Sequence, residues 1–286
     1  MTTRRDFLQT LAGGVGLAAL GAAPARSGGP ARIGLQLYSL RNQFKTDVPG
    51  TLAKVKSIGF ENVETAGFYG LSPEAFAAEL KKAGLSCRSG HWDYDRYRQD
   101  PAAVAREAKT LGASFMACAW IPHEGKFTRE DAMKAADVFT KAARVARDNG
   151  LRFAYHIHGY EFEPSTEGTL FDTLAANTPA DLVLFEADVL WVTAGGQDPA
   201  AFIEKHAGRV PLTHLKDMVK GTKYTPPTTQ IPETANVVLG TGMIDIPAIL
   251  RASAKSGVEY HFVEDEHPDS LQHLPSSLAY LRSHLS

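Results

Sequence analysis

The chain has 286 residues, of which 44% are hydrophobic and 22% charged, an ordinary globular composition that can bury a large core. Its formal net charge of -2 gives no indication of a polyanionic partner, so we expect no nucleic-acid binding. Cys87 and Cys118 lie in apolar strand-like runs, so buried free thiols are expected rather than the disulfide that an oxidising compartment would permit.

The N-terminus differs in kind from the rest of the chain. Arg4 and Arg5 precede an apolar run of small residues over 11–23, which is followed by an A-x-A-like cleavage site. The run is too short to span a bilayer stably, so no stable membrane insertion is expected. Paired arginines favour a twin-arginine signal peptide over residues 1–25, rather than a disordered terminus or a membrane anchor. We therefore expect export to the periplasm, with residues 31–286 forming a single domain.

From residue 32 onward, short β-rich runs alternate with amphipathic helical patterns. The runs that predict strands are 33–39, 61–66, 85–91, 114–120, 151–158, 182–189, 210–215 and 259–264. The patterns that predict helices include 48–58, 73–83, 130–148, 199–207 and a terminal helix over 274–284. Eight strands with helical crossovers favour a parallel sheet closed into a (β/α)8 TIM barrel. The alternative, a doubly wound open sheet, is weakened because no Gly-rich nucleotide-binding motif follows a strand.

Acidic, imidazole and indole side chains gather at the predicted C-terminal ends of these strands, where barrel enzymes carry their chemistry. They are Glu64, His91, Trp120, His156 and His158, Glu186 and Asp188, His214, and Glu264. Strand alternation predicts that Glu186 and Asp188 share the inward face, opposite Phe185. The same alternation places His156 and His158 together on one face of their strand.

Several ionised carboxylates in one barrel mouth would repel one another and be costly to desolvate. A divalent cation removes that cost, and carboxylates combined with imidazoles suit Mn, Co, Fe, Zn or Mg. A metal-free polar network is the alternative. Because acidic or imidazole residues end four consecutive strands, we expect a metal site.

Six sequence motifs resemble a known family. They are IGLQLYSLR, GFENVETAGFYGLSPEAFAAELKKAGL, YHIHGYEF, FEADVLWVTAGGQDPAAFIEKHAGRVPLTHLKDM, LGTGMIDIPAIL and VEDE. Over about residues 31–284 the chain is similar to the sugar phosphate isomerase/epimerase group of xylose isomerase-like TIM barrels, and within it to an exported subgroup. In that family a divalent metal is held by Glu, Asp, His and Glu at the ends of strands five to eight. The resemblance implies Asp188, His214 and Glu264 for the last three ligands.

Two positions depart from the family pattern. The strand-five Glu is replaced by His156, which we take as the fourth ligand, with His158 and Glu161 as the other candidates. Where relatives often carry a substrate-contacting His after the strand-six Asp, this chain has Trp191, whose indole could stack on a sugar ring. Direct inheritance of ketose epimerisation by two opposed glutamates is therefore not expected.

Taken together, these features predict a metal-dependent isomerase or epimerase acting on a sugar or keto-sugar through an enediolate. The expected catalytic residues are Glu264, His156, His158 and Lys216, and the expected substrate contacts are Glu64, His91, Trp120, Glu161 and Trp191. The alternatives are a lyase acting on 3-keto-glycosides and a non-catalytic sugar- or metal-binding barrel. The irregular stretch 218–237 after the seventh strand is a candidate lid. No oligomeric state is predicted.

Overall fold

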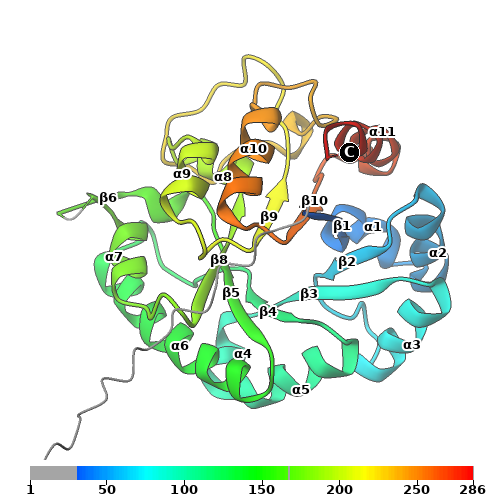
Figure 1. Ribbon diagram of the computed structural model, residues 1–286, viewed down its shortest axis with the longest axis horizontal. Helices are drawn as coiled ribbons and strands as arrows, with labels where there is room; N and C mark the ends of the chain where they lie inside the picture. Colours follow the sequence, from blue (N-terminus) through cyan, green and yellow to red (C-terminus); the bar gives the residue numbers. More distant parts are fainter. Residues whose placement is uncertain (1–30, 167, 286) are drawn as a thin grey trace, which may run out of the picture.

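The structure, a computed structural model, describes residues 31–166 and 168–285. The predicted signal peptide, residues 1–25, lies outside them. Eight parallel strands close into a barrel in the order β1-β10-β9-β8-β5-β4-β3-β2 (Figure 1). The strands are β1 (Arg32–Gln36), β2 (Asn62–Thr65), β3 (Ser86–Trp92), β4 (Phe115–Cys118), β5 (Arg152–His156), β8 (Val183–Asp188), β9 (Leu212–Leu215) and β10 (Tyr260–Val263). The predicted (β/α)8 fold is confirmed.

Each of the eight predicted strands corresponds to one barrel strand, but several predictions extend too far at the C-terminal end. The strand expected over 33–39 stops at Gln36, where a 3-10 helix, η1 (Leu37–Leu40), begins. The strand expected over 151–158 stops at His156. The backbone thus leaves the sheet just where the polar side chains begin. A short hairpin of β6 (Pro164–Ser165) and β7 (Gly168–Thr169) was not predicted.

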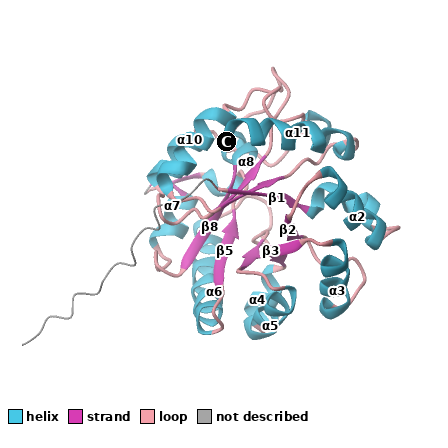
Figure 2. Cartoon of the chain, turned by 45° about the vertical axis from the view of Figure 1, so that its right-hand side comes forward, coloured by secondary structure: helices cyan, strands magenta, loops and turns pink. Residues whose placement is uncertain are grey.

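Helices cover the outside of the barrel, as Figure 2 shows. They are α1 (Arg41–Phe44), α2 (Val48–Ile58), α3 (Pro73–Ala83), α4 (Tyr94–Gln99), α5 (Pro101–Leu111), α6 (Arg129–Asp148), α7 (Leu170–Ala176), α8 (Val189–Ala194), α9 (Pro199–Lys205), α10 (Ile246–Ser256) and α11 (Ser270–Leu285), with a further 3-10 turn, η3 (Glu233–Ala235). Local sequence sets their ends. For example, the Ser72 hydroxyl accepts from the Ala75 N–H to start α3, and Gly84, at φ +70°, ends it.

The barrel interior changes character along its axis. Apolar side chains fill its lower part as one cluster: Phe115, Ala117, Ala154, Leu184, Leu212, Tyr260 and Phe262. On β8, Val183 and Phe185 instead belong to the larger core between strands and helices. Leu184, Glu186 and Asp188 therefore alternate onto the inner face, as predicted. The titratable side chains thus lie above an apolar floor, at the end of the barrel where the strands terminate.

The candidate lid, residues 218–237, is attached to the barrel at its base. Met218 and Asn236 form an isolated antiparallel bridge that closes the segment. The preceding residue, Asp217, is buried and accepts four backbone N–H groups, those of Met218, Gly240, Gly242 and Ile244. The Asp217 carboxylate therefore connects the start of the candidate lid to residues 240–244, which follow its end.

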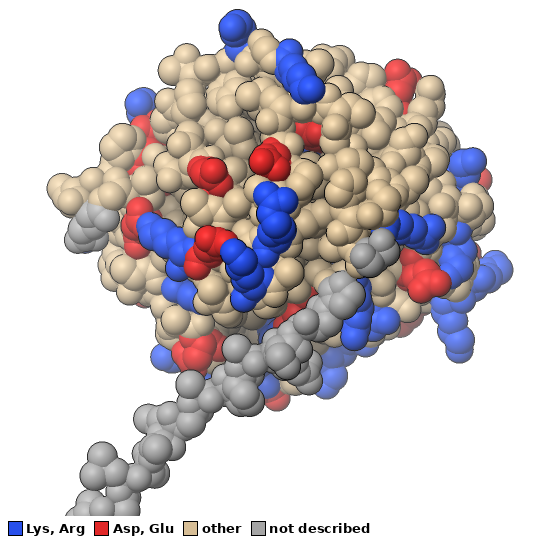
Figure 3. Space-filling model, turned by 45° about the horizontal axis from the view of Figure 1, so that its top comes forward, with Lys and Arg blue, Asp and Glu red and all other residues tan. Residues whose placement is uncertain are grey.

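The surface carries charges of both signs. Figure 3 shows Lys and Arg side chains interspersed with Asp and Glu over the face in view. Within the part of the chain that the structure describes, no helix combines the length and the apolar character needed to cross a membrane. Cys87 and Cys118 are buried and unpaired.

Candidate functional site

The C-terminal ends of the strands surround a cavity of 620 Å³. The predicted site residues that line it are His91, Trp120, His156, His158, Trp191, Lys216 and Glu264. Thr229, from the candidate lid, closes part of its wall. The cavity is of the size that binds small organic molecules, and it lies at the face where barrel enzymes carry out their chemistry.

Four potential metal ligands converge at the base of this cavity. His156, Asp188, His214 and Glu264 each offer one atom, and these four atoms lie within 4.8 Å of one another. The residues come from, or directly follow, four neighbouring strands, β5, β8, β9 and β10. The structure thus brings together the four predicted ligands, which together make a donor set of two imidazoles and two carboxylates.

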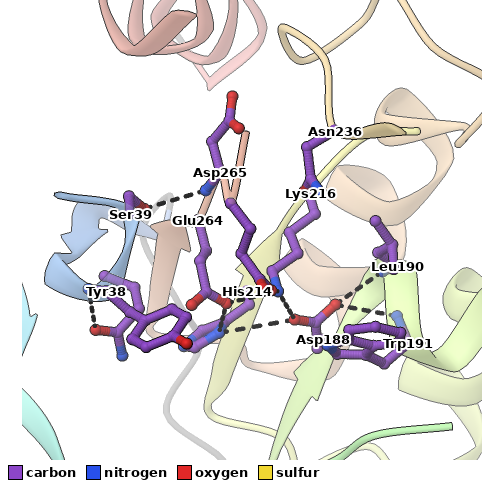
Figure 4. A network of polar contacts seen from close by, with 12 residues as sticks. Tyr38, Ser39, Asp188, Leu190, Trp191, His214, Lys216, Asn236, Glu264 and Asp265 are labelled. Atoms are coloured by element: carbon purple, nitrogen blue, oxygen red, sulfur yellow. Dashed lines mark hydrogen bonds and ion pairs between the residues drawn. The ribbon is translucent and has the colours of Figure 1, made fainter. Parts of the chain in front are cut away.

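One end of the Asp188 carboxylate is fixed by backbone. Its Oδ1 accepts from the N–H groups of Leu190, at 2.9 Å, and Trp191, at 3.1 Å, where α8 begins (Figure 4). Its Oδ2 is buried, lies 3.1 Å from Lys216 Nζ, and faces His156 Nε2 at 3.9 Å and His214 Nδ1 at 3.8 Å. Because Oδ1 is fixed by these hydrogen bonds, Oδ2 is oriented toward the two imidazoles, where a metal ligand would have to lie.

The electrostatics of this group fit a cation. Burial raises the pKa of Asp188 to about 6, although Lys216 acts to lower it. Burial also opposes ionisation of Glu264, but Lys216 and His214 hold the pKa of that carboxyl well below its ordinary value. Two buried carboxylates, which here share the one ammonium of Lys216, and two ring nitrogens in reach form a donor set that suits a divalent ion. The residues present therefore fit such an ion.

Lys216 contributes the positive charge that the protein itself supplies. Its Nζ lies 3.1 Å from Asp188 Oδ2 and 2.8 Å from Glu264 Oε2, and it also contacts Glu266. The side chain is 1% exposed and lies over the Trp191 ring at 5.4 Å. These three carboxylates raise its pKa well above the ordinary value despite burial. Lys216 is therefore an ammonium donor inside the donor set, not part of a surface loop.

A second carboxylate layer lies beneath the four ligands. Glu64 and Glu186 are both fully buried, and His214 Nε2 lies 2.5 Å from Glu64 Oε2 and 3.3 Å from Glu186 Oε1. His91 Nε2 lies 2.7 Å from Glu186 Oε2 and 3.3 Å from Glu64 Oε2. The sequence places Glu186 at the strand end, but no role was predicted for it. Glu186 lies two residues before Asp188 on the same face of the strand, and this spacing could have indicated that it belongs to the site.

His158 lies in an aromatic environment on the cavity wall. Its ring packs edge-on to Trp120, with centroids 5.0 Å apart, and lies 5.9 Å from Trp191. Its Nδ1 is buried and has no hydrogen-bond partner. Burial lowers the pKa of His158 well below its ordinary value, so the imidazole is neutral at pH 7.

Two expected substrate contacts do not reach the cavity. Glu161 is fully buried, accepts from the Tyr155 hydroxyl and the His158 backbone N–H, and does not line the cavity wall. The reason is that β5 ends at His156 and a 3-10 turn, η2 (Tyr160–Phe162), follows, so strand alternation no longer applies. Glu64 lies below the cavity, where Gln36 Nε2 donates to it at 2.7 Å. Neither residue lines the cavity, and direct contact with a substrate stays a prediction for both.

Other cavity residues were not predicted as contacts. They include Phe68, Asp93, Arg96 and Glu266. These four residues follow the strand ends by one to four positions, beyond the part of the chain to which alternation applies. Position just after a strand was the signal that could have identified them.

Comparisons with known proteins agree with this architecture. The sequence profile of the family described as "Xylose isomerase-like TIM barrel" matches residues 52–284. Two structures from Parabacteroides distasonis, each described as a sugar phosphate isomerase/epimerase, have TM-scores of 0.74 and 0.73 at 23% and 25% identity. They align with 91% and 88% of this chain and with 98% of each of theirs.

A curated relative gives a shorter match. An inosose dehydratase from Clostridium beijerinckii is 34% identical over 98 residues, which span 33% of this chain and 32% of that protein. A structure of the IOLI protein with a bound zinc atom has a TM-score of 0.69 at 15% identity, over 89% of this chain and 98% of that one. Because the family profile matches most of the described barrel, the chain belongs to the xylose isomerase-like TIM barrel family.

Proposed function

We propose that the chain is a divalent-metal-dependent sugar isomerase or epimerase that moves a proton beside a carbonyl group. The single observation that carries the proposal is the convergence of His156, Asp188, His214 and Glu264, which each offer one ligand atom within 4.8 Å of the others. The similarity to structures described as sugar phosphate isomerase/epimerases supports the same reaction class.

The four donors would hold the ion. A divalent cation bound there supplies Lewis-acid stabilisation of the negative charge that develops on a carbonyl oxygen. Lys216 Nζ, between Asp188 and Glu264, adds the protein's own positive charge at the same place. The protein thus places positive charge where an enediolate would carry negative charge.

Two groups are positioned to move the proton. Glu264 lies at the end of β10 and His158 just beyond β5, at the two ends of the arc of strands that carries the donors. Glu264 is ionised and His158 is neutral, so each can accept a proton. Epimerisation requires a base on one face of the carbon and a protonated donor on the other, so while one of these groups takes the proton, the other must return a proton that it has first taken up from water.

The cavity favours an uncharged sugar over a sugar phosphate. Of the described residues, the Lys and Arg side chains that line it are Arg96 and Lys216. Both Arg96 amino groups donate to Glu107, at 2.8 Å each, and Lys216 is paired with three carboxylates. A phosphate would therefore meet no unpaired cation in this wall. The indoles of Trp120 and Trp191 instead offer apolar faces for a sugar ring.

Elimination is the second candidate reaction. The match to an inosose dehydratase, 34% identical over 98 residues, favours it. If the carbanion formed beside the carbonyl expels a neighbouring oxygen, the same residues make a lyase, for example on a 3-keto-glycoside. We further propose that residues 1–25 direct export through the twin-arginine route, so that the folded protein acts in the periplasm on free or oxidised glycosides.

The test has a binding arm and a reaction arm. Elemental analysis of the purified protein is expected to find about one divalent ion per chain, and Asp188→Ala and His214→Ala to lose it. Protein loaded with Mn²⁺ and incubated with keto-sugars in deuterated water is expected to place label at the carbon beside the carbonyl. No metal in the wild type would refute the site. Metal without label would indicate a binding protein and refute catalysis on those sugars.

A further inference from the structure

Each of the two imidazole ligands lies between two layers of carboxylates. His214 Nδ1 is 2.9 Å from Glu264 Oε2 on the cavity side, and its Nε2 is 2.5 Å from Glu64 Oε2 on the buried side. His156 Nε2 faces Asp188 Oδ2 at 3.9 Å, and its Nδ1 lies 3.3 Å from Glu186 Oε2. In both rings, one nitrogen faces the proposed cation and the other faces a buried glutamate.

The buried glutamates have no route to the substrate. Glu64 and Glu186 are both 0% exposed, and neither lines the cavity. The Oε1 atoms of both residues are buried without hydrogen-bond partners, so each carboxylate has acceptor capacity to spare. A buried carboxylate that contacts neither solvent nor substrate is costly to keep, and the groups it serves here are the imidazoles.

Backbone register makes this arrangement a property of the fold. In the pairing of β5 with β8, His156 is directly opposite Glu186, and in the pairing of β8 with β9, Asp188 is opposite His214. Glu186 and Asp188 share the inner face of β8 two residues apart, so one strand supplies both layers. Glu64 is opposite Gln36 in the pairing of β1 with β2, and that side chain donates to it.

We propose that Glu64 and Glu186 are positioning residues that accept hydrogen bonds from the buried-side nitrogens of His214 and His156. This leaves His214 Nδ1 and His156 Nε2 as the two metal-binding atoms. Partners of this kind fix the orientation and the tautomer of a histidine ligand and raise its basicity. The inference rests on the proposed metal site and assigns which atom of each imidazole binds.

The arrangement also explains how a histidine serves at the end of β5. A carboxylate ligand brings its own charge, whereas a neutral imidazole binds a cation well only when its other nitrogen has an acceptor. His156 Nδ1 is buried without a hydrogen-bond partner, and Glu186 Oε2, 3.3 Å away across the strand pair, is the carboxylate placed to become that acceptor. His91, between Glu186 and Glu64, gives the two carboxylates a common partner on the cavity side.

Metal affinity measured by competition with a chromophoric chelator tests the assignment. For Mn²⁺ and Zn²⁺ separately, we expect Glu186→Gln to weaken binding about 10-fold and Glu186→Leu about 100-fold, because Gln keeps an acceptor oxygen and Leu does not. Glu64→Gln is expected to behave like Glu186→Gln. Glu161→Gln is the matched control, because Glu161 is equally buried but accepts a hydrogen bond from Tyr155 instead of from a proposed ligand. The metal affinity of this variant should equal that of the wild type. Thermal melts check that each variant folds.

Long-range ¹H–¹⁵N spectra of histidine-labelled protein with Zn²⁺ identify the binding atoms directly. We expect His214 bound through Nδ1 and His156 through Nε2, each with its other nitrogen protonated. The deeper group of His91, His156, Glu186 and His214 could itself take the ion. Zn²⁺ bound through His214 Nε2 and His156 Nδ1 would overturn the inference and move the metal to the deeper group. In that case Asp188→Asn would leave metal affinity unchanged and His91→Gln would strongly reduce it. Unchanged affinity in Glu186→Leu would overturn the inference while leaving the metal site intact, and a wild type without metal would overturn both.

Discussion

Replacing Lys216 by Met should make the stability of the protein depend on divalent metal. The Lys216 ammonium is the protein's own countercharge to Asp188 and Glu264, from which it lies 3.1 Å and 2.8 Å. Asp188 is fully buried and Glu264 is 6% exposed, so solvent cannot replace the lost charge. Removing one partner of a buried ion pair costs about 3–5 kcal/mol, which in a domain of this size lowers the melting temperature by roughly 10 °C.

The assay is thermal unfolding in EDTA and in excess Mn²⁺ at pH 8, which is above the pKa of about 6 of Asp188 in the wild type. In EDTA, Lys216→Met should melt roughly 10 °C below the wild type. In Mn²⁺ the melting temperature of Lys216→Met should recover. The increase on adding Mn²⁺ should be larger for the variant than for the wild type, because no ammonium competes with the ion for Asp188 and Glu264. Lys205→Met is the control, since that exposed pair with Asp172 contributes about 1 kcal/mol or less. Equal melting of Lys216→Met and wild type in EDTA would refute the reasoning.

Two further predictions concern buried carboxylates outside the donor set. Burial raises the pKa of Glu161 to about 7 from 4.5, so its contribution to stability is complete below pH 4.5 and is lost as the pH rises through 7. Between pH 4.5 and 8 the free energy of unfolding of the wild type should therefore fall by about 3 kcal/mol relative to that of Glu161→Gln, as measured by urea unfolding. Parallel pH profiles of the two proteins would contradict this. Asp217→Asn should cost about 2–6 kcal/mol, because an amide keeps one acceptor oxygen for four N–H groups. Asp245→Asn should leave stability nearly unchanged, because Asp245 is a helix N-cap and Asn caps helices as well as Asp does. An equal loss of stability in both variants would contradict the role given to the four N–H groups around Asp217.

Alternation predicted the site wherever the chain was still in a strand. On β8 it placed Glu186 and Asp188 inside, and the structure finds both there. It does not reach Glu161, because β5 ends at His156 and the following turn is oriented by its own packing on Tyr155. Lys216 lies one residue past β9, and its pairing with three carboxylates depends on segments far apart in the sequence.

The order of apolar and polar residues was by itself enough to determine the closed parallel barrel and the rim on which its acidic and imidazole side chains gather. Both follow from periods of 2 and 3.6 residues, which local sequence carries. Which nitrogen of His156 and His214 faces which carboxylate was decided only in three dimensions. That choice depends on the register between neighbouring strands, where Glu186 meets His156 and Asp188 meets His214, and register is set by the closing of the whole barrel.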